Sequence, residues 1–237
     1  MAEVISFVSG KGGMGTTALC AAVAAAMAAE GKRVLCIDCD DGAGDLGAYL
    51  GLGQLPDITY PEVCRGDYPL ERATAQPDLT RLRFLAAPAG KDPVDQADFA
   101  ALIAQAKRSF DYIFLDSPQF LHHGECTFVV TAANSAAIHG ARRLADSLEL
   151  QGIQNVRLLV NFIDKKEMAA MGLTVDDVMD QVGLPLGGIV PRDNTVTLAC
   201  AAEKMLHTAT KKGAAAAAQR IARRMQGFSI AIPTRVL

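Results

Sequence analysis

The sequence contains no tryptophan, and aromatic residues make up only 5% of its 237 residues. Because half of the residues are hydrophobic, a core must be built mainly from Ala, Val, Leu, Ile and Met. Such small side chains suit helices that pack closely on a sheet. A chain of this length can bury a large core without disulfides or structural metals, and one compact α/β domain fits it.

Long hydrophobic runs are also absent. The most apolar stretch, residues 18–29, consists largely of alanine and is too short to cross a bilayer. Residues 1–6 lack the basic and apolar segments of a secretion signal, and no Ser/Pro-rich linker divides the chain. We therefore expect a single cytoplasmic domain that spans residues 1–237.

Paired cysteines, which most structural zinc sites use, are scarce. Six cysteines are present, but only Cys36 and Cys39 lie close together, and no second such pair exists. Scattered thiols with apolar neighbours indicate buried residues in a reducing compartment. The segment His122-His123-Gly124-Glu125-Cys126 contains metal-competent side chains, but their geometry in a loop is free, so we interpret it as a solvent-exposed loop.

Positive charge is concentrated near the C-terminus. Residues 203–237 carry seven Lys or Arg and one acid, although the whole chain has a net charge of -3. A predicted helix at 214–226 places Ala217, Ile221 and Met225 on one face and its arginines mainly elsewhere. We favour packing of this basic helix and tail, about 211–237, onto the domain or onto a dimer mate. Peripheral contact with the inner face of the cell membrane is the alternative.

Strand-like and helix-like segments alternate along the chain. Strands are predicted at residues 3–8, 33–37, 82–86, 112–115, 128–131, 156–160 and 186–190, and helices at 17–30, 96–110, 141–150, 174–181, 195–206 and 214–226. The first strand, helix and second strand form a βαβ unit, which requires parallel strands. The pattern therefore predicts an α/β fold with a mostly parallel central sheet.

Polar residues follow four of the predicted strands. Ser9, Asp38, Asp116 and Asn161 each end an apolar run. In an open parallel sheet these positions meet at one edge, where ligands bind. We therefore expect a site at the edge that also carries the glycine-rich loop after the first strand.

That loop has the properties of a phosphate-binding loop. Gly10, Gly12, Gly13 and Gly15 let the backbone turn its N–H groups towards phosphate oxygens. A helix that begins near Thr16 adds the favourable end of its dipole. Thr17 supplies a hydroxyl at the position that ligates Mg²⁺ in such loops. The sequence therefore predicts binding of a nucleoside triphosphate.

The loop Ser9-Gly10-Lys11-Gly12-Gly13-Met14-Gly15-Thr16-Thr17 resembles the deviant Walker A loop of the MinD/ParA ATPases, Lys-Gly-Gly-x-Gly-Lys-Thr. Residues 37–40, 112–118, 160–161 and 189–193 continue the resemblance in the right order, over residues 4 to about 206. It implies a three-layer P-loop NTPase fold, ATP and Mg²⁺ as ligands, and a homodimer in the ATP-bound state.

The resemblance also implies residue roles. Lys11 corresponds to the signature lysine, which reaches the nucleotide of the partner subunit, and Asp40 would position the attacking water. Thr17, Asp38 and Asp116 would hold Mg²⁺. The remaining implied nucleotide contacts are Gly10, Gly12, Gly13, Met14, Gly15 and Thr16 around the phosphates, and Asn161, Pro191, Arg192 and Asp193 on the adenine side.

Two positions depart from the family pattern. Thr16 stands where the family has the lysine that bridges the β- and γ-phosphates, which predicts weak hydrolysis. After Ser117-Pro118 the chain continues as Gln119-Phe120 and lacks the glycine that the family usually has two residues after the proline. This segment corresponds to the second switch of the family, and we expect it to move differently from the switch of its relatives.

The resemblance implies an ATP-driven switch that positions cellular machinery, such as a division site, a partitioned plasmid, a pilus or a flagellum, with an unidentified protein partner. DNA binding is less favoured. A nucleotide-binding scaffold without hydrolysis, as in the pilus-localisation branch that lacks the same lysine, is the first alternative. A metallochaperone-type ATPase is the second, and it would require Cys64 and Cys126 to meet at a dimer axis.

Overall fold

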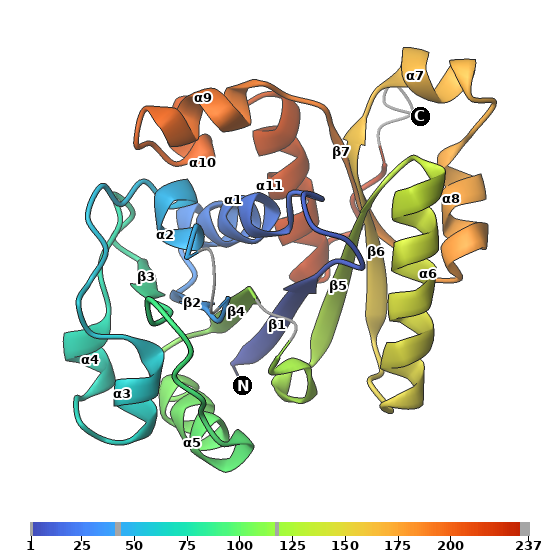
Figure 1. Ribbon diagram of the computed structural model, residues 1–237. Coiled ribbons are helices and arrows are strands. Elements are labelled where there is room, and N and C mark those ends of the chain that lie inside the picture. Colours follow the sequence, from blue (N-terminus) through green and yellow to red (C-terminus); the bar gives the residue numbers. More distant parts are fainter. Residues whose placement is uncertain (1, 41–43, 117–118, 233–237) are drawn as a thin grey trace.

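The computed structural model describes residues 2–40, 44–116 and 119–232. A seven-stranded sheet lies at its centre, in the order β3-β2-β4-β1-β5-β6-β7, with helices on both faces (Figure 1). Every pair of neighbouring strands is parallel. The predicted three-layer α/β fold is therefore confirmed, and its described sheet is parallel throughout.

The strands lie where the sequence predicts them. They are β1 (Glu3–Val8), β2 (Val34–Asp38), β3 (Leu82–Leu85), β4 (Tyr112–Asp116), β5 (Cys126–Ala132), β6 (Val156–Ile163) and β7 (Leu186–Pro191). They are mostly buried because helices cover both faces, which explains their continuous apolar runs. Strands β5 and β6 extend beyond the predicted ranges, and Cys126 belongs to β5 rather than to a loop.

The longer helices also match the prediction. They are α1 (Thr16–Ala29), α5 (Gln96–Ala106), α6 (Ser135–Leu150), α8 (Val175–Val182), α9 (Thr195–Ala201) and α11 (Gly213–Met225). Helix α6 begins earlier than predicted, because Asn134 caps it by accepting a hydrogen bond from the Ala137 amide at 3.1 Å. The predicted helix at 195–206 is wrong in its second half: Glu203 adopts a φ of 52°, which ends the helical path.

Six short elements were not predicted. They are α2 (Leu46–Tyr49), α3 (Tyr60–Cys64), α4 (Leu70–Ala73), the 3₁₀ turn η1 (Leu121–His123), α7 (Lys165–Ala170) and α10 (Leu206–Ala209). Each is too short to establish a helical period of apolar residues in the sequence. Two of them carry local signals: the capping box between Thr59 and Glu62 at the start of α3, and Asp164, which caps α7 and is followed three residues later by Glu167.

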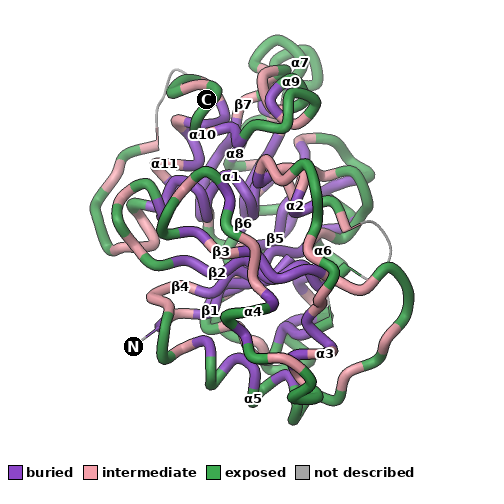
Figure 2. The backbone as a smooth tube through the Cα atoms, turned by 90° about the vertical axis from the view of Figure 1, so that its left-hand side faces the viewer, coloured by how far each residue is buried: buried purple, intermediate pink, exposed green. Residues whose placement is uncertain are grey.

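Alternate residues of each strand face different helices. Ile5 and Phe7 point to the layer formed by α1 and α11, whereas Val4 faces α3 and α5 and Val8 faces α6 and α8. Helix α1 is almost completely buried, so the sheet and this helix form the centre of the molecule (Figure 2).

Helix α11 packs onto the domain. Its alanines and Ile221 are buried against α1 and β7, and Met225 packs beside them. The Arg224 guanidinium donates to the carbonyls of Gly187, at 3.1 Å, and Ile230, at 2.8 Å, which fixes the following segment beside β7. The packing that we favoured for the apolar face of this helix is therefore confirmed. No helix in the described ranges has the length and apolarity to cross a bilayer.

Candidate functional site

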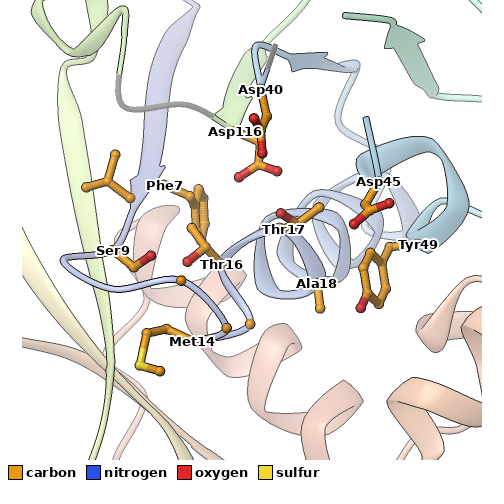
Figure 3. A pocket seen from close by; sticks show the side chains of 14 residues that line it. Phe7, Ser9, Met14, Thr16, Thr17, Ala18, Asp40, Asp45, Tyr49 and Asp116 are labelled. Carbon is orange, nitrogen blue, oxygen red and sulfur yellow. The ribbon is translucent and has the colours of Figure 1, made fainter. Parts of the chain in front are cut away.

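The carboxyl ends of the strands meet at the edge that carries the glycine loop. Asp116 at the end of β4 lines a cavity of about 420 Å³ that the glycine loop also lines, and Asp38 is its register neighbour on β2. Asp38 itself is not among the residues that line this cavity. Figure 3 shows the side chains of Asp40, Asp116 and Thr17 directed towards this space. The cavity is lined by Phe7, Val8, Ser9, Gly12, Gly13, Met14, Gly15, Thr16, Thr17, Ala18, Asp40, Asp45, Tyr49 and Asp116.

Two loop positions require glycine for conformational reasons. Gly13 and Gly15 have φ values of 78° and 77°, a region that other residues rarely adopt. Gly15 precedes the first turn of α1, so the free N–H groups of that turn face the cavity side of the loop. This cradle fits phosphate oxygens.

Gly10 is required because the loop touches α6. A Cβ atom at Gly10 would lie 2.1 Å from the Gly140 carbonyl oxygen, and a Cβ atom at Gly140 would lie 2.9 Å from the Gly10 carbonyl oxygen. The two backbones are therefore in direct contact. Gly140 was missed by the sequence reasoning, although a glycine inside a helix is an unfavourable choice that points to close packing.

Asn161 supports the loop from the other side. This residue is 4% exposed, and its Nδ2 donates to the Met14 carbonyl at 2.9 Å while its Oδ1 accepts from the Phe162 amide at 2.8 Å. Phe162 has a φ of 57°, a strained conformation of the kind found at binding sites. The structure thus places Asn161 against the loop backbone.

A second cavity, of about 250 Å³, adjoins the first and contains the other predicted base-side residues. Pro191, Arg192 and Asp193 line it together with Asn161 and Phe162. The Arg192 guanidinium lies 5.8 Å from the centre of the Phe162 ring. The two cavities share Gly15, Ala18 and Tyr49 in their walls, so they adjoin, and we call the two together the groove.

Asp193 also has a structural role. Its carboxylate accepts hydrogen bonds from the amides of Thr195 and Ala214, both at 2.9 Å, and so binds the first turn of α11. Burial alone would raise the pKa of Asp193, but these hydrogen bonds leave it below its ordinary value.

The carboxylates of Asp38 and Asp116 are buried, and neither forms a salt bridge within the part of the chain that the structure describes. Burial raises the pKa of Asp38 to about 6. The hydrogen bonds that Asp38 accepts from the amides of Asp40 and Leu46 lower this pKa and so oppose part of the effect. Burial also raises the pKa of Asp116 to about 7, and the Thr17 hydroxyl partly opposes this through a hydrogen bond. Paired carboxylates and a hydroxyl are suitable ligands for Mg²⁺, which keeps several waters and needs few protein ligands. The residues present therefore fit this ion.

The predicted lysine does not enter the cavity of its own chain. Lys11 is exposed and lies outside the set of lining residues, and Thr16 lines the cavity without a charge. Among the lining residues that the structure describes, three are aspartates and none is a cation. Asp45 and Tyr49 were missed by the sequence reasoning because they lie at the two ends of the unpredicted helix α2.

The alternative metal ligands lie apart from this groove. Cys126 is buried at the start of β5, at the opposite edge of the sheet, and His123 is within hydrogen-bond distance, 3.0 Å, of Gln96. Within the described ranges, no three His, Cys, Asp or Glu side chains are grouped to hold a metal. Two predicted switch residues, Ser117 and Pro118, are outside the residues that the structure describes.

A parallel sheet with a glycine loop and strand-end carboxylates defines a P-loop nucleotide-binding protein. Residues 5–206 match the CobQ/CobB/MinD/ParA nucleotide binding domain, and the chain belongs to this family, as a MinD/ParA-type P-loop ATPase. The septum site-determining protein MinD of Synechocystis is 31% identical over 245 residues, which cover 97% of this chain and 91% of the relative. The Bacillus subtilis MinD protein is 30% identical over 252 residues, covering 100% and 93%.

Solved structures agree with this assignment. MinD in the MinC:MinD cell division protein complex of Aquifex aeolicus superimposes with a TM-score of 0.89 at 29% identity, covering 98% of both chains. The MinD protein of Pyrococcus horikoshii, solved with Mg-ADP, has a TM-score of 0.82 at 22% identity, covering 95% of this chain and 96% of that chain. The second comparison supports the fold alone.

The contact between Gly10 and Gly140 predicts that Gly140→Ala separates stability from nucleotide binding. Alanine favours a helix interior by about 1 kcal/mol over glycine, so the fold should tolerate the change. Its Cβ atom would push the loop backbone by several tenths of an ångström, which should weaken ATP binding on the order of tenfold. Calorimetric titration with ATP and Mg²⁺ measures this. Gly90→Ala, at an open position, is the control, and equal affinities of the two variants would contradict the prediction.

The raised pKa of Asp116 predicts a pH-dependent stability in the metal-free protein. The pKa is about 7 in the folded chain and about 4 in the unfolded chain, so the folded form holds the proton more tightly and loses stability as pH rises from 4 to 7. Asp116→Asn removes this cost and should raise the free energy of unfolding at pH 8 by on the order of 2 kcal/mol. The gain should shrink at pH 5.

Urea unfolding in EDTA at both pH values tests this effect. Asp180→Asn, on an exposed side chain of α8, is the control and should show no comparable gain. If the Asp116 variant is no more stable than the parent at pH 8, the buried charge of Asp116 does not lower the free energy of unfolding of the metal-free protein.

Proposed function

We propose that the chain is an ATP-binding switch of the MinD type that takes part in placing the cell division site, with ATP-linked dimerisation and weak hydrolysis. The observation that carries the proposal is the pair of adjoining cavities between the glycine loop and residues 191–193, with the buried carboxylate of Asp116 in the first of them and that of Asp38 beside it in the sheet. The septum-site function named for the relatives supports the cellular role. The proposal takes residues 1–237 as one domain.

The two cavities of the groove would take the phosphates and the adenine of ATP. The loop amides, Thr16 and Thr17 would hold the phosphates, and the cavity lined by Asn161, Pro191, Arg192 and Asp193 would take the adenine. Mg²⁺, when bound, neutralises charge on the phosphates. Thr17, Asp38 and Asp116 would hold it, since they supply the oxygen ligands at that end.

The catalytic end of the groove is incomplete in one chain. Asp40 lines the cavity, where its carboxylate can orient a water for attack on the γ-phosphate. Thr16 is too short and carries no charge to stabilise the leaving oxygen, so bond cleavage is impaired more than binding. Lys11 is exposed at the loop surface and available to a second chain. A dimer would thus supply the cation that one chain lacks.

The proposed partners are a second copy of this chain and another protein. Aquifex MinD, which has the same fold, was solved in a complex with MinC, and this supports a protein partner here. The proposal places the protein in the cytoplasm, with any membrane contact peripheral and made by the basic C-terminal tail. Because α11 buries its apolar face in the domain, such contact would rest on charge and on the segment after Met225.

A nucleotide-binding scaffold without turnover is the second candidate. Thr16 is the specific observation that favours it, since the groove remains suitable for binding while a cation for the transition state is missing. The two candidates share the site and differ only in whether ATP is cleaved.

The exposed position of Lys11 predicts that Lys11→Ala blocks ATP-linked dimerisation. A dimer that relies on this ammonium to reach the partner's phosphates should not form without it, so the variant should remain monomeric in ATP and Mg²⁺. Light scattering coupled to size-exclusion chromatography measures the mass. Lys91→Ala changes another exposed lysine and should dimerise as the parent does. Dimerisation of the Lys11 variant at the parent's level would reject the role across the interface.

The uncharged Thr16 predicts that Thr16→Lys increases turnover. Loss of one transition-state stabiliser typically costs on the order of a hundred- to a thousandfold in rate, so restoring a cation should raise phosphate release at least about tenfold. The parent should show low or undetectable turnover with binding retained. The gain should disappear in the Thr16→Lys, Asp40→Asn double variant if it arises at this site. Parent turnover comparable to that of ordinary family members would show that the missing charge is supplied from elsewhere.

A further inference from the structure

The junction between the two cavities contains a polar side chain with no assigned role. Three residues are common to both cavities: Gly15, Ala18 and Tyr49. The first two belong to the loop and to α1 and present no polar side-chain atom. Tyr49 ends α2 and lies across from Ala18, so its phenol is the one side-chain polar group among the described residues shared by both cavities (Figure 3).

The ring of Tyr49 is fixed, while its hydroxyl is not engaged. The half-buried ring packs against the core cluster that contains α1. Within the described parts of the chain, the hydroxyl has no hydrogen-bond partner. Burial raises the pKa of Tyr49, with smaller contributions from Cys200 and Asp45, so the hydroxyl keeps its proton at neutral pH and can both donate and accept. A positioned ring with an unused hydroxyl is suited to recognition of a ligand.

We propose that Tyr49 is a specificity-determining residue that hydrogen-bonds a ribose hydroxyl of the bound nucleotide. The inference rests on the proposed function and deepens it. A nucleotide whose phosphates occupy the loop cavity and whose base occupies the cavity beside Pro191 has only its ribose to place at the junction. The ribose carries vicinal hydroxyls, which match the donor and acceptor capacity of a phenol. The site therefore favours a nucleotide with both ribose hydroxyls over an analogue that lacks the bonded one.

The test combines ligand and protein changes. Calorimetric titration in Mg²⁺ compares ATP, 2′-deoxy-ATP and 3′-deoxy-ATP on the parent, on Tyr49→Phe and on Tyr112→Phe. Phenylalanine keeps the ring and removes only the hydroxyl. Tyr112 is the matched control, because it is also partly buried but begins β4 at the opposite edge of the sheet.

The expected result is a loss of discrimination. The parent should bind ATP about fivefold more tightly than at least one deoxy analogue, as one hydrogen bond implies. Tyr49→Phe should weaken ATP binding by about the same factor and leave that analogue unaffected. Tyr112→Phe should keep the parent's preference.

Three outcomes would count against the proposal in different ways. Equal affinity of the parent for all three nucleotides would overturn the ribose contact without the need for a variant. Equal weakening of all three by Tyr49→Phe would show that the phenol acts through packing alone, and would also overturn it. If the parent binds none of them, the proposed nucleotide function itself fails.

Discussion

The shape of the glycine loop depends on backbone contact with elements that come much later in the chain. Gly10 touches Gly140 of α6, and Asn161 at the end of β6 donates to the Met14 carbonyl. The left-handed φ values at Gly13 and Gly15 allow the loop to curl, but they do not select one curl over another. The two long-range contacts make that selection. A phosphate cradle preorganised in this way pays little ordering entropy when a ligand binds.

Charge is the second constraint on the site. Asp40, which follows β2, and Asp116, which ends β4, line the cavity, and burial raises the pKa values of Asp38 and Asp116. In most P-loops a lysine of the same chain offsets part of this negative charge. Here Thr16 occupies its position, so no lining side chain that the structure describes carries a positive charge. In the proposed function, a bound divalent ion and the lysine of a second chain would supply the balance.

The sequence was most informative where chemistry and topology coincide. Strand-end residues such as Asp38 and Asp116 could be placed together because parallel strands bring their carboxyl ends to one edge. The contact of Gly140 with the loop could not be predicted, because it joins residues 130 positions apart through backbone atoms only. Tyr49 was missed for another reason: helix α2 has four residues, too few for a periodic pattern.

The cavity beside Pro191 is connected to the C-terminal helix by hydrogen bonds. Asp193 lines the cavity beside Pro191 and also accepts a hydrogen bond from the Ala214 amide in the first turn of α11. At the other end of α11, Arg224 holds the carbonyl of Ile230 and so fixes the segment that leads to the tail. A ligand that donates a hydrogen bond to the carboxylate of Asp193 would compete with the Ala214 amide for the carboxylate oxygens. The same helix buries its apolar face on α1, whose first turn faces the phosphates. Helix α11 therefore contacts both the cavity beside Pro191 and the helix that begins at the glycine loop.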